Sequence, residues 1–163
     1  MAKPIITLLA ALVFAGFGAM SAAHAEDLEF RAVMHVTSAQ TQDVGDVEGH
    51  ALGLVRASGI ASFQDGSTAT TYYITQTDFV NGSGTIASYN NLTFDDGSVL
   101  WYRTAGTATV DGNRTIFRAT ITVVGGKGRF ANAKGEGGSN GARLTPLAVG
   151  ADLFLDQMIS VKK

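Results

Sequence analysis

The chain contains no cysteine among its 163 residues, only two prolines and three histidines, and few charged residues. Without cysteine there can be no disulfide, no thiolate metal site and no cysteine nucleophile. Three histidines leave little for a histidine-rich metal site, so we expect no metal and no other cofactor. The 12 basic and 14 acidic residues nearly balance, which argues against a nucleic-acid binder held by phosphate contacts.

The first 25 residues have the pattern of a secretory signal peptide. Lys3 supplies a positive charge, residues 5–17 are mostly apolar, and Ala23-His24-Ala25 offers the small residues that cleavage requires. The apolar run is shorter than the roughly 20 residues that a membrane helix needs. We therefore expect cleavage after Ala25, export to the periplasm or the extracellular space, and one soluble domain over residues 26–163 with no membrane association.

Alternation of apolar and polar residues dominates the rest of the chain, and helical periodicity is almost absent. Over residues 28–37 the even positions are apolar and the odd positions mostly polar, which is typical of a strand with one buried face. The polar segment 38–49 that follows is expected to be a long loop. Further strands are expected at 50–63, 68–80, 85–94, 98–110, 114–124, 135–144 and 152–161.

Short turn sequences separate most of these strands. Asp65-Gly66, Asn81-Gly82, Asp96-Gly97 and Asp111-Gly112 all favour tight hairpins. Hairpins make consecutive strands antiparallel neighbours, and closing such a sheet on itself removes its unpaired edges. The sequence therefore predicts an all-β fold, a single eight-stranded antiparallel barrel whose interior is filled by side chains or holds one small ligand.

The most specific local sequence is the glycine-rich run from Gly125 to Gly137. Its spacing fits neither a phosphate-binding loop nor a dinucleotide fingerprint, and no strand–helix–strand unit surrounds it. We interpret the run as structural, with glycines that let Phe130 and Ala133 turn inward as a short plug at one barrel end. The structural residues of this motif are Gly125, Gly126, Gly128, Phe130, Ala133 and Gly135.

This run, Gly-Gly-Lys-Gly-Arg-Phe at 125–130 followed by Ala-Lys-Gly at 133–135, resembles the late motif of allene oxide cyclases and dirigent proteins. The first strand, with Phe30, Met34 and His35, is similar to the aromatic-x-Met-His segment that opens many dirigent domains. The resemblance extends over about residues 28–161. It implies an eight-stranded antiparallel barrel, typically a homotrimer, with an apolar cavity open at one end.

The first-strand catalytic groups that this resemblance implies are not retained. Dirigent proteins usually carry Asp directly after Met-His inside the cavity, and this chain has Val36 there. The apolar face of the strand has neither the Glu nor the Asn of the cyclases, and their pocket Cys has no counterpart. A methyl-bearing side chain cannot transfer a proton, so neither family activity is expected.

Candidate ligand-binding residues come from the strands that are expected to line the cavity. Tyr72-Tyr73 and Trp101-Tyr102 each place one ring on either face of a strand, and the sequence leaves open which ring faces inward. His35, His50 and Arg118 are expected to face solvent. Asp78 shares the face of Gln76 and is expected near a strand end in contact with water. The candidates are Met34, Val36, Tyr72, Gln76, Trp101 and Tyr102.

Three functions compete for such a chain. The first is an exported protein that binds or shelters an apolar or aromatic small molecule. The second is an isomerase or cyclase acting on an apolar substrate in the same cavity, and the third is a structural or interaction protein with a filled barrel. A cavity lined by paired polar groups would favour the enzyme, an apolar cavity would favour the binding protein, and a packed interior would favour the structural protein.

Overall fold

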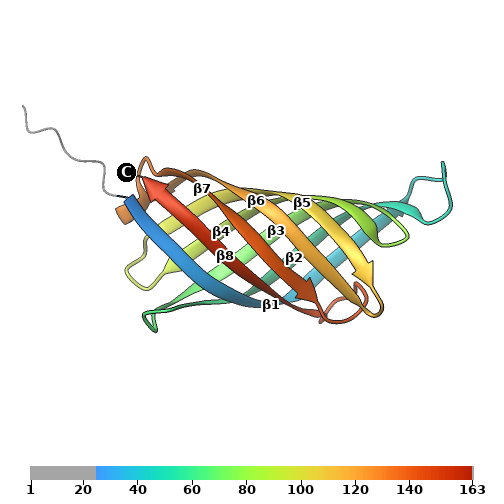
Figure 1. Cartoon of the computed structure of the whole chain (residues 1–163), viewed down its shortest axis with the longest axis horizontal. Coiled ribbons are helices and arrows are strands. Elements are labelled where there is room, and N and C mark those ends of the chain that lie inside the picture. Colours follow the sequence, from blue (N-terminus) through green and yellow to red (C-terminus); the bar gives the residue numbers. More distant parts are fainter. Residues whose placement is uncertain (1–24, 163) are drawn as a thin grey trace, which may run out of the picture.

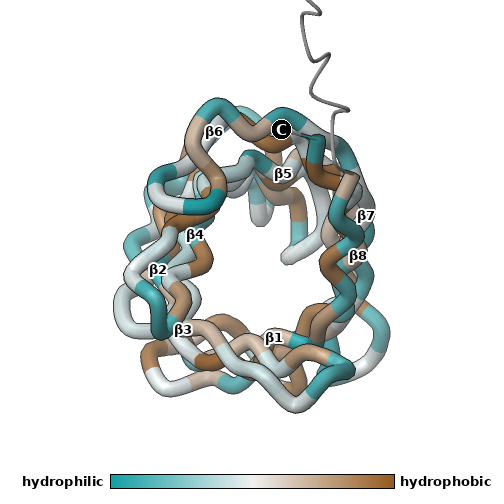
Figure 2. The backbone as a smooth tube through the Cα atoms, turned by 90° about the vertical axis from the view of Figure 1, so that its left-hand side faces the viewer, coloured by the Kyte–Doolittle hydropathy of each residue, from teal (hydrophilic) through white to brown (hydrophobic). Residues whose placement is uncertain are grey.

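Eight strands form one closed antiparallel barrel in the computed structural model, which describes residues 25–162 (Figure 1). The strands are β1 (Ala25–Asp43), β2 (His50–Phe63), β3 (Thr68–Val80), β4 (Ser83–Phe94), β5 (Val99–Asp111), β6 (Arg114–Lys127), β7 (Lys134–Arg143) and β8 (Asp152–Lys162). Each strand pairs with the next, and β8 pairs with β1 to close the ring (Figure 2). The predicted fold class is thus confirmed. The expected signal peptide falls on residues 1–25, of which residues 1–24 lie outside the described residues.

Strict alternation along β1 shows how the sequence builds the barrel wall. Leu28, Phe30, Ala32, Met34 and Val36 are buried, and the residues between them are exposed. Burying this apolar face inside the ring removes its surface from water, which is the main force that closes the barrel. Within residues 25–162, no helix is long and apolar enough to cross a lipid bilayer.

The hairpin turns form where the sequence predicts them. Asn81 (φ 52°) and Gly82 (φ 79°) both adopt positive φ, as a two-residue turn between twisted strands requires. Gly66, Gly97 and Gly112 also have positive φ in the turns that follow β2, β4 and β5. These short connections explain why neighbouring strands in the chain are neighbours in the barrel.

The prediction of a long loop over residues 38–49 is wrong for its first half. β1 continues to Asp43, past a bulge at Thr37, and residues 38–43 pair with Ala51–Arg56 of β2. This part of the β1–β2 hairpin extends beyond the barrel body and is mostly exposed on both faces. Polar residues therefore occupy both faces of a strand here, and apolar alternation could not reveal it.

The two ends of the barrel differ in their contents. The first and last described residues lie at one end, and four phenylalanines fill the interior there: Phe30, Phe63, Phe94 and Phe130. We call this the closed end. The opposite end carries the β1–β2, β3–β4, β5–β6 and β7–β8 connections, and we call it the open end (Figure 1).

The glycine-rich motif helps to seal the closed end. A 3-10 turn, η1 (Gly128–Phe130), follows β6 and carries Phe130 into the interior, where Phe130 and Ala133 are fully buried. The Phe130 ring lies 5.2 Å from the Phe94 ring, and the Arg129 guanidinium covers both rings from outside. Gly128 has φ 63°, and a Cβ atom there would overlap the Ser98 hydroxyl, so the turn needs glycine.

A cavity at the open end of the barrel

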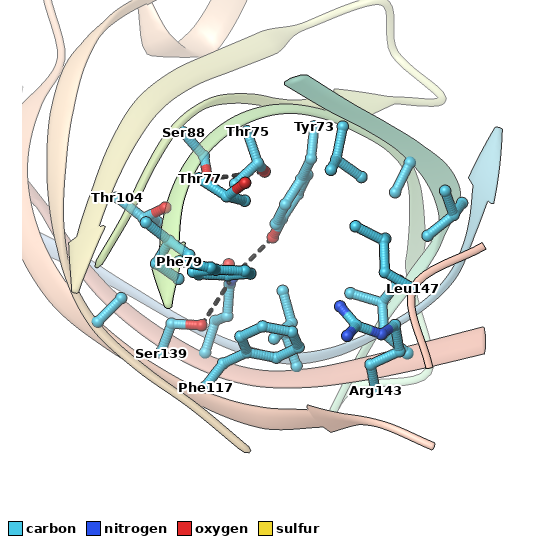
Figure 3. A pocket seen from close by; sticks show the side chains of 18 residues that line it. Tyr73, Thr75, Thr77, Phe79, Ser88, Thr104, Phe117, Ser139, Arg143 and Leu147 are labelled. Carbon is cyan, nitrogen blue, oxygen red and sulfur yellow. Dashed lines mark hydrogen bonds between the residues drawn. The ribbon is translucent and has the colours of Figure 1, made fainter. Parts of the chain in front are cut away.

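Inward side chains of the open half surround a cavity (Figure 3). The empty space between its lining atoms is about 700 Å³, open solvent at the mouth included, and the space open to the centre of a water-sized sphere is about 70 Å³. The latter is about half of the roughly 150 Å³ that holds benzene in an engineered apolar cavity, so a ligand with an aromatic ring would extend into the open mouth. The lining residues are Val36, Val55, Ala57, Tyr73, Thr75, Thr77, Phe79, Ile86, Ser88, Thr104, Phe117, Ala119, Ser139, Arg143, Leu147, Leu153, Leu155 and Gln157.

A closed ring of hydrogen bonds joins two tyrosines and a glutamine at the inner side of the cavity. The Tyr102 hydroxyl donates to Gln157 Oε1 (2.9 Å), and Gln157 Nε2 donates to the Tyr73 hydroxyl (2.7 Å). The Tyr73 hydroxyl must then donate to the Tyr102 oxygen, 2.8 Å away, because the Tyr102 proton is already used. Gln157 Nε2 also donates to Ser139 Oγ (3.1 Å), which leaves the Ser139 hydroxyl proton free to meet a ligand.

The cavity offers hydrogen bonds but no general base. Burial raises the pKa of Tyr73 to about 12 and that of Tyr102 well above its ordinary value, so both phenols stay protonated near neutral pH. No histidine, aspartate or glutamate is among the lining residues. Apart from the Gln157 amide and the Arg143 guanidinium, the remaining polar groups are hydroxyls, such as Thr75 Oγ1 and Ser88 Oγ, which bond to each other at 2.9 Å. These groups can orient a ligand but cannot remove a proton from one.

The connection between β7 and β8 lies across the mouth. Leu147 of this connection lines the cavity, and Gly150 N donates to the Val36 carbonyl (2.7 Å), which ties the segment to β1. Arg143, the last residue of β7, donates from Nε to the Thr145 carbonyl (2.9 Å). A surface depression at the open end shares Arg143, Leu147 and Phe79 with the cavity, so ligands would enter there.

The six candidate ligand-binding residues divide between the two faces of the barrel wall. Val36 lines the cavity, Tyr102 belongs to its hydrogen-bonded ring, and Met34 is buried in the apolar core. The other three candidates, Tyr72, Gln76 and Trp101, lie on strand positions that face away from the cavity. Tyr73 and Tyr102 are thus the inward members of the two aromatic pairs. Both faces of β3 carry polar residues, so its sequence alone could not decide the orientation.

Of the polar residues that were expected to face solvent, His50 is the exception, because its side chain is only 16% exposed. His35 and Arg118 are exposed on the outer face. His50 is mostly covered and lies between two carboxylates, with Nδ1 2.6 Å from Asp46 and Nε2 2.9 Å from Asp78. The two carboxylates flank opposite ring nitrogens and cannot meet on one ion. The described residues hold no group of three or more potential metal ligands.

Two polar residues of the cavity, Gln157 and Arg143, are not among the candidates from the sequence. Gln157 interrupts the apolar face of β8, and that parity was a usable signal for an inward polar group. Arg143 was harder to find because three of the other inward positions of β7 are glycines: Gly135, Gly137 and Gly141. A side chain at Gly137 would overlap the Met158 carbonyl, so the strands approach too closely for one. Without side chains on that face, β7 shows no alternation.

Comparisons with known proteins match this fold but not the sequence. Neither a family model nor a curated protein sequence matches the chain. The pterocarpan synthase dirigent protein PsPTS1 is similar in structure, with 13% identity, 84% of this chain and 95% of that chain covered, and a TM-score of 0.52. A protein with unknown function from Clostridium acetobutylicum ATCC 824 has 13% identity, coverage of 87% and 99%, and a TM-score of 0.55.

A second pterocarpan synthase dirigent protein, GePTS1, has 12% identity, 87% coverage of both chains and a TM-score of 0.50. The chain has a dirigent-like barrel. In that barrel, Val36 faces the cavity. The position at which the sequence resemblance implies an aspartate therefore holds an inert apolar side chain on the cavity wall.

Proposed function

We propose that this protein binds an apolar or aromatic small molecule in the open-end cavity. The observation that carries the proposal is the cavity itself: a mostly apolar pocket inside the barrel wall, with a few hydroxyls and one guanidinium, and a mouth toward solvent. Ligand sites are commonly apolar hollows with a small number of placed polar groups. The enclosed volume of about 70 Å³ and the open mouth together suit a small ligand, of about one ring and a short chain, that lies partly in the mouth.

Binding without acid–base catalysis fits the cavity better than turnover. General acid–base catalysis by an isomerase or cyclase needs a group that moves a proton, and such groups contribute about 10²–10⁴-fold in rate. The phenols of Tyr73 and Tyr102 are locked into a satisfied ring and have raised pKa values. Val36 supplies no substitute for an aspartate. The enzyme hypothesis therefore ranks second.

The third hypothesis, a filled barrel, describes only the closed half. Phe30, Phe63 and Phe94 contact one another there with ring centroids 5.1 and 5.6 Å apart, and they leave the cavity to the other half. Export remains part of the proposal, supported by the signal-like sequence of residues 1–25. N-terminal sequencing of exported protein is expected to begin at Glu26.

Calorimetry with the neutral ligand 3-phenylpropan-1-ol tests the binding proposal. A ring and chain that lose about 200 Å² of apolar surface gain about 5 kcal/mol, which corresponds to a Kd on the order of 0.1–1 mM. Ala119→Leu extends a side chain into the cavity and should abolish binding. Ala105→Leu makes the same change on the exposed outer face and should leave binding intact. Equal binding by both variants, or none by the wild type, would refute the proposal.

A further inference from the structure

Arg143 is a buried cation that has no anionic partner among residues 25–162. Arg143 is only 7% exposed and lies where the cavity meets its mouth. Nε donates to the Thr145 carbonyl (2.9 Å) and one Nη2 hydrogen to Thr115 Oγ1 (2.8 Å). Both acceptors are neutral. The other three N–H donors of the guanidinium make no hydrogen bond within the part of the chain that the structure describes.

No negative charge inside the barrel compensates this cation. The cavity wall contains no aspartate or glutamate, and no described carboxylate lies within ion-pair distance of Arg143. Its nearest ring is Phe117, whose centroid lies 5.9 Å from Arg143 Cζ. Burying an unpaired charge is costly, and in this chain desolvation lowers the pKa of the Arg143 guanidinium without neutralising it. An anion that entered the cavity would relieve that cost.

Apolar groups surround the free side of the guanidinium. Figure 3 shows Arg143, Leu147 and Phe117 among the side chains that line one cavity. A ligand bound there would place its charged group on Arg143 and its apolar body against the wall formed by Leu153 and Leu155. The arrangement favours molecules that have both an anionic group and an apolar body. The cation alone could be paired equally well by small ions from the solvent.

We infer that the open-end cavity is a receptor for small carboxylic acids, with Arg143 as the residue that binds the carboxylate. This inference rests on the proposed binding function and specifies its ligand class. A planar guanidinium matches the two oxygens of a carboxylate with paired hydrogen bonds. A single negative charge balances the single cation, whereas a phosphate dianion would leave excess charge among apolar side chains. The ligand is a monoanion with about one ring or a short chain behind it.

Matched ligands and matched variants test the inference. Calorimetry at pH 7 compares 3-phenylpropanoate with the neutral 3-phenylpropan-1-ol, which has the same ring and chain. The wild type should bind the acid about 10–100-fold more tightly, the range expected for charge-assisted hydrogen bonds. Arg143→Met should remove that preference, so that the acid binds no more tightly than the alcohol does. Arg118→Met removes an exposed cation from β6 and should change neither affinity.

A second measurement does not depend on the variant's stability. In the wild type, the Nη–H resonances of Arg143, which include its three unbonded donors, should shift more on titration with the acid than with the alcohol. Equal binding of acid and alcohol would overturn the carboxylate inference and leave the binding function standing. A preference for the acid that survives Arg143→Met, or unmoved Nη–H resonances, would assign the anion to another site. If neither molecule binds, the binding function itself fails.

Discussion

The two ends of the barrel use the same strands in opposite ways. At the closed end, four phenylalanines and the 3-10 turn fill the interior, and Arg129 covers the rings from outside. At the open end, the inward positions of β3, β4 and β5 carry smaller residues such as Thr75, Ser88 and Thr104, and a cavity remains. The barrel wall is continuous, so the volume of the inward side chains decides which half is packed and which half has room for a ligand.

Removing one phenylalanine ring from each end should give the largest difference in stability between the two halves. Phe130→Ala should lower the free energy of unfolding by about 3–5 kcal/mol, because it leaves a cavity in a packed cluster. Phe117→Ala removes the same atoms from the cavity wall, where the ring is only partly buried, and should cost less than half as much. Urea unfolding of both variants measures the difference. Equal losses would mean that the open half is packed as tightly as the closed one.

The turn of the closed end gives the next largest effect. Gly128→Ala should destabilise the protein by about 1–3 kcal/mol, through positive φ and overlap with Ser98. Gly112 in the β5–β6 turn has φ 60°, but no atom lies within 4 Å of the place that a methyl group would take, so Gly112→Ala should cost only about 1 kcal/mol. Thermal unfolding of the pair separates backbone strain from the close contact. Matching melting temperatures would show that the Ser98 side chain moves away from the added methyl group at little cost in free energy.

A buried amide marks the boundary between the two halves. Asn90 lies opposite Tyr73 and Tyr102 in the strand register, and neither of its side-chain polar atoms has a hydrogen-bond partner within the described residues. Asn90→Leu should therefore raise the free energy of unfolding by about 1 kcal/mol, since it removes an unsatisfied buried group. Asn91→Leu, on the outer face of the same strand, should change it by less than about 0.5 kcal/mol. Destabilisation by Asn90→Leu would instead reveal a water-bonded amide.

The smallest effect concerns the hairpin at the open end. The neighbouring carboxylates raise the pKa of His50 above 6.5, chiefly through the hydrogen bond to Asp46, and the same bond lowers the pKa of Asp46 below 3.8. A raised histidine pKa adds stability that is complete below pH 6.5 and is lost as the pH rises through the folded value. The lowered Asp46 pKa adds stability above pH 3.8, so the contact is strongest between these limits.

A proton NMR titration of His50 measures this contact. The folded pKa should lie above 6.5, and Asp46→Asn should lower it more than Asp78→Asn does, because Asp46 makes the larger contribution. The melting temperature of the wild type should fall between pH 6 and pH 8 by more than that of His50→Gln. A His50 pKa at or below 6.5 would contradict the hydrogen-bonded pair of carboxylates.

The sequence predicts the closed half better than the open half for a physical reason. Large apolar residues at alternate positions, as in Phe30 and Met34 of β1, reveal which face is buried. Glycine-rich turns and the motif around Gly128 reveal where strands reverse. Each of these signals comes from the requirements of packing and backbone geometry, and the packed half satisfies them most fully.

The cavity is less visible because a ligand site departs from the same rules. Thr75 and Thr77 are inward, while Gln76 and Asp78 are outward, so β3 has polar residues on both faces and its orientation was open. Arg143 follows a run of glycines that hides the inward face of β7. The polar residues of the cavity are therefore those whose inward orientation could not be predicted from alternation.

Methyl NMR of the wild type with 3-phenylpropan-1-ol tests most directly the claim that one half of the barrel holds a ligand and the other half does not. Saturating alcohol should shift the methyl resonances of Val36, Leu147 and Leu153, which line the cavity, and leave Val161 near the closed end unchanged. Shifts at Val161 of the same size, or no shift at the three cavity residues, would contradict the account.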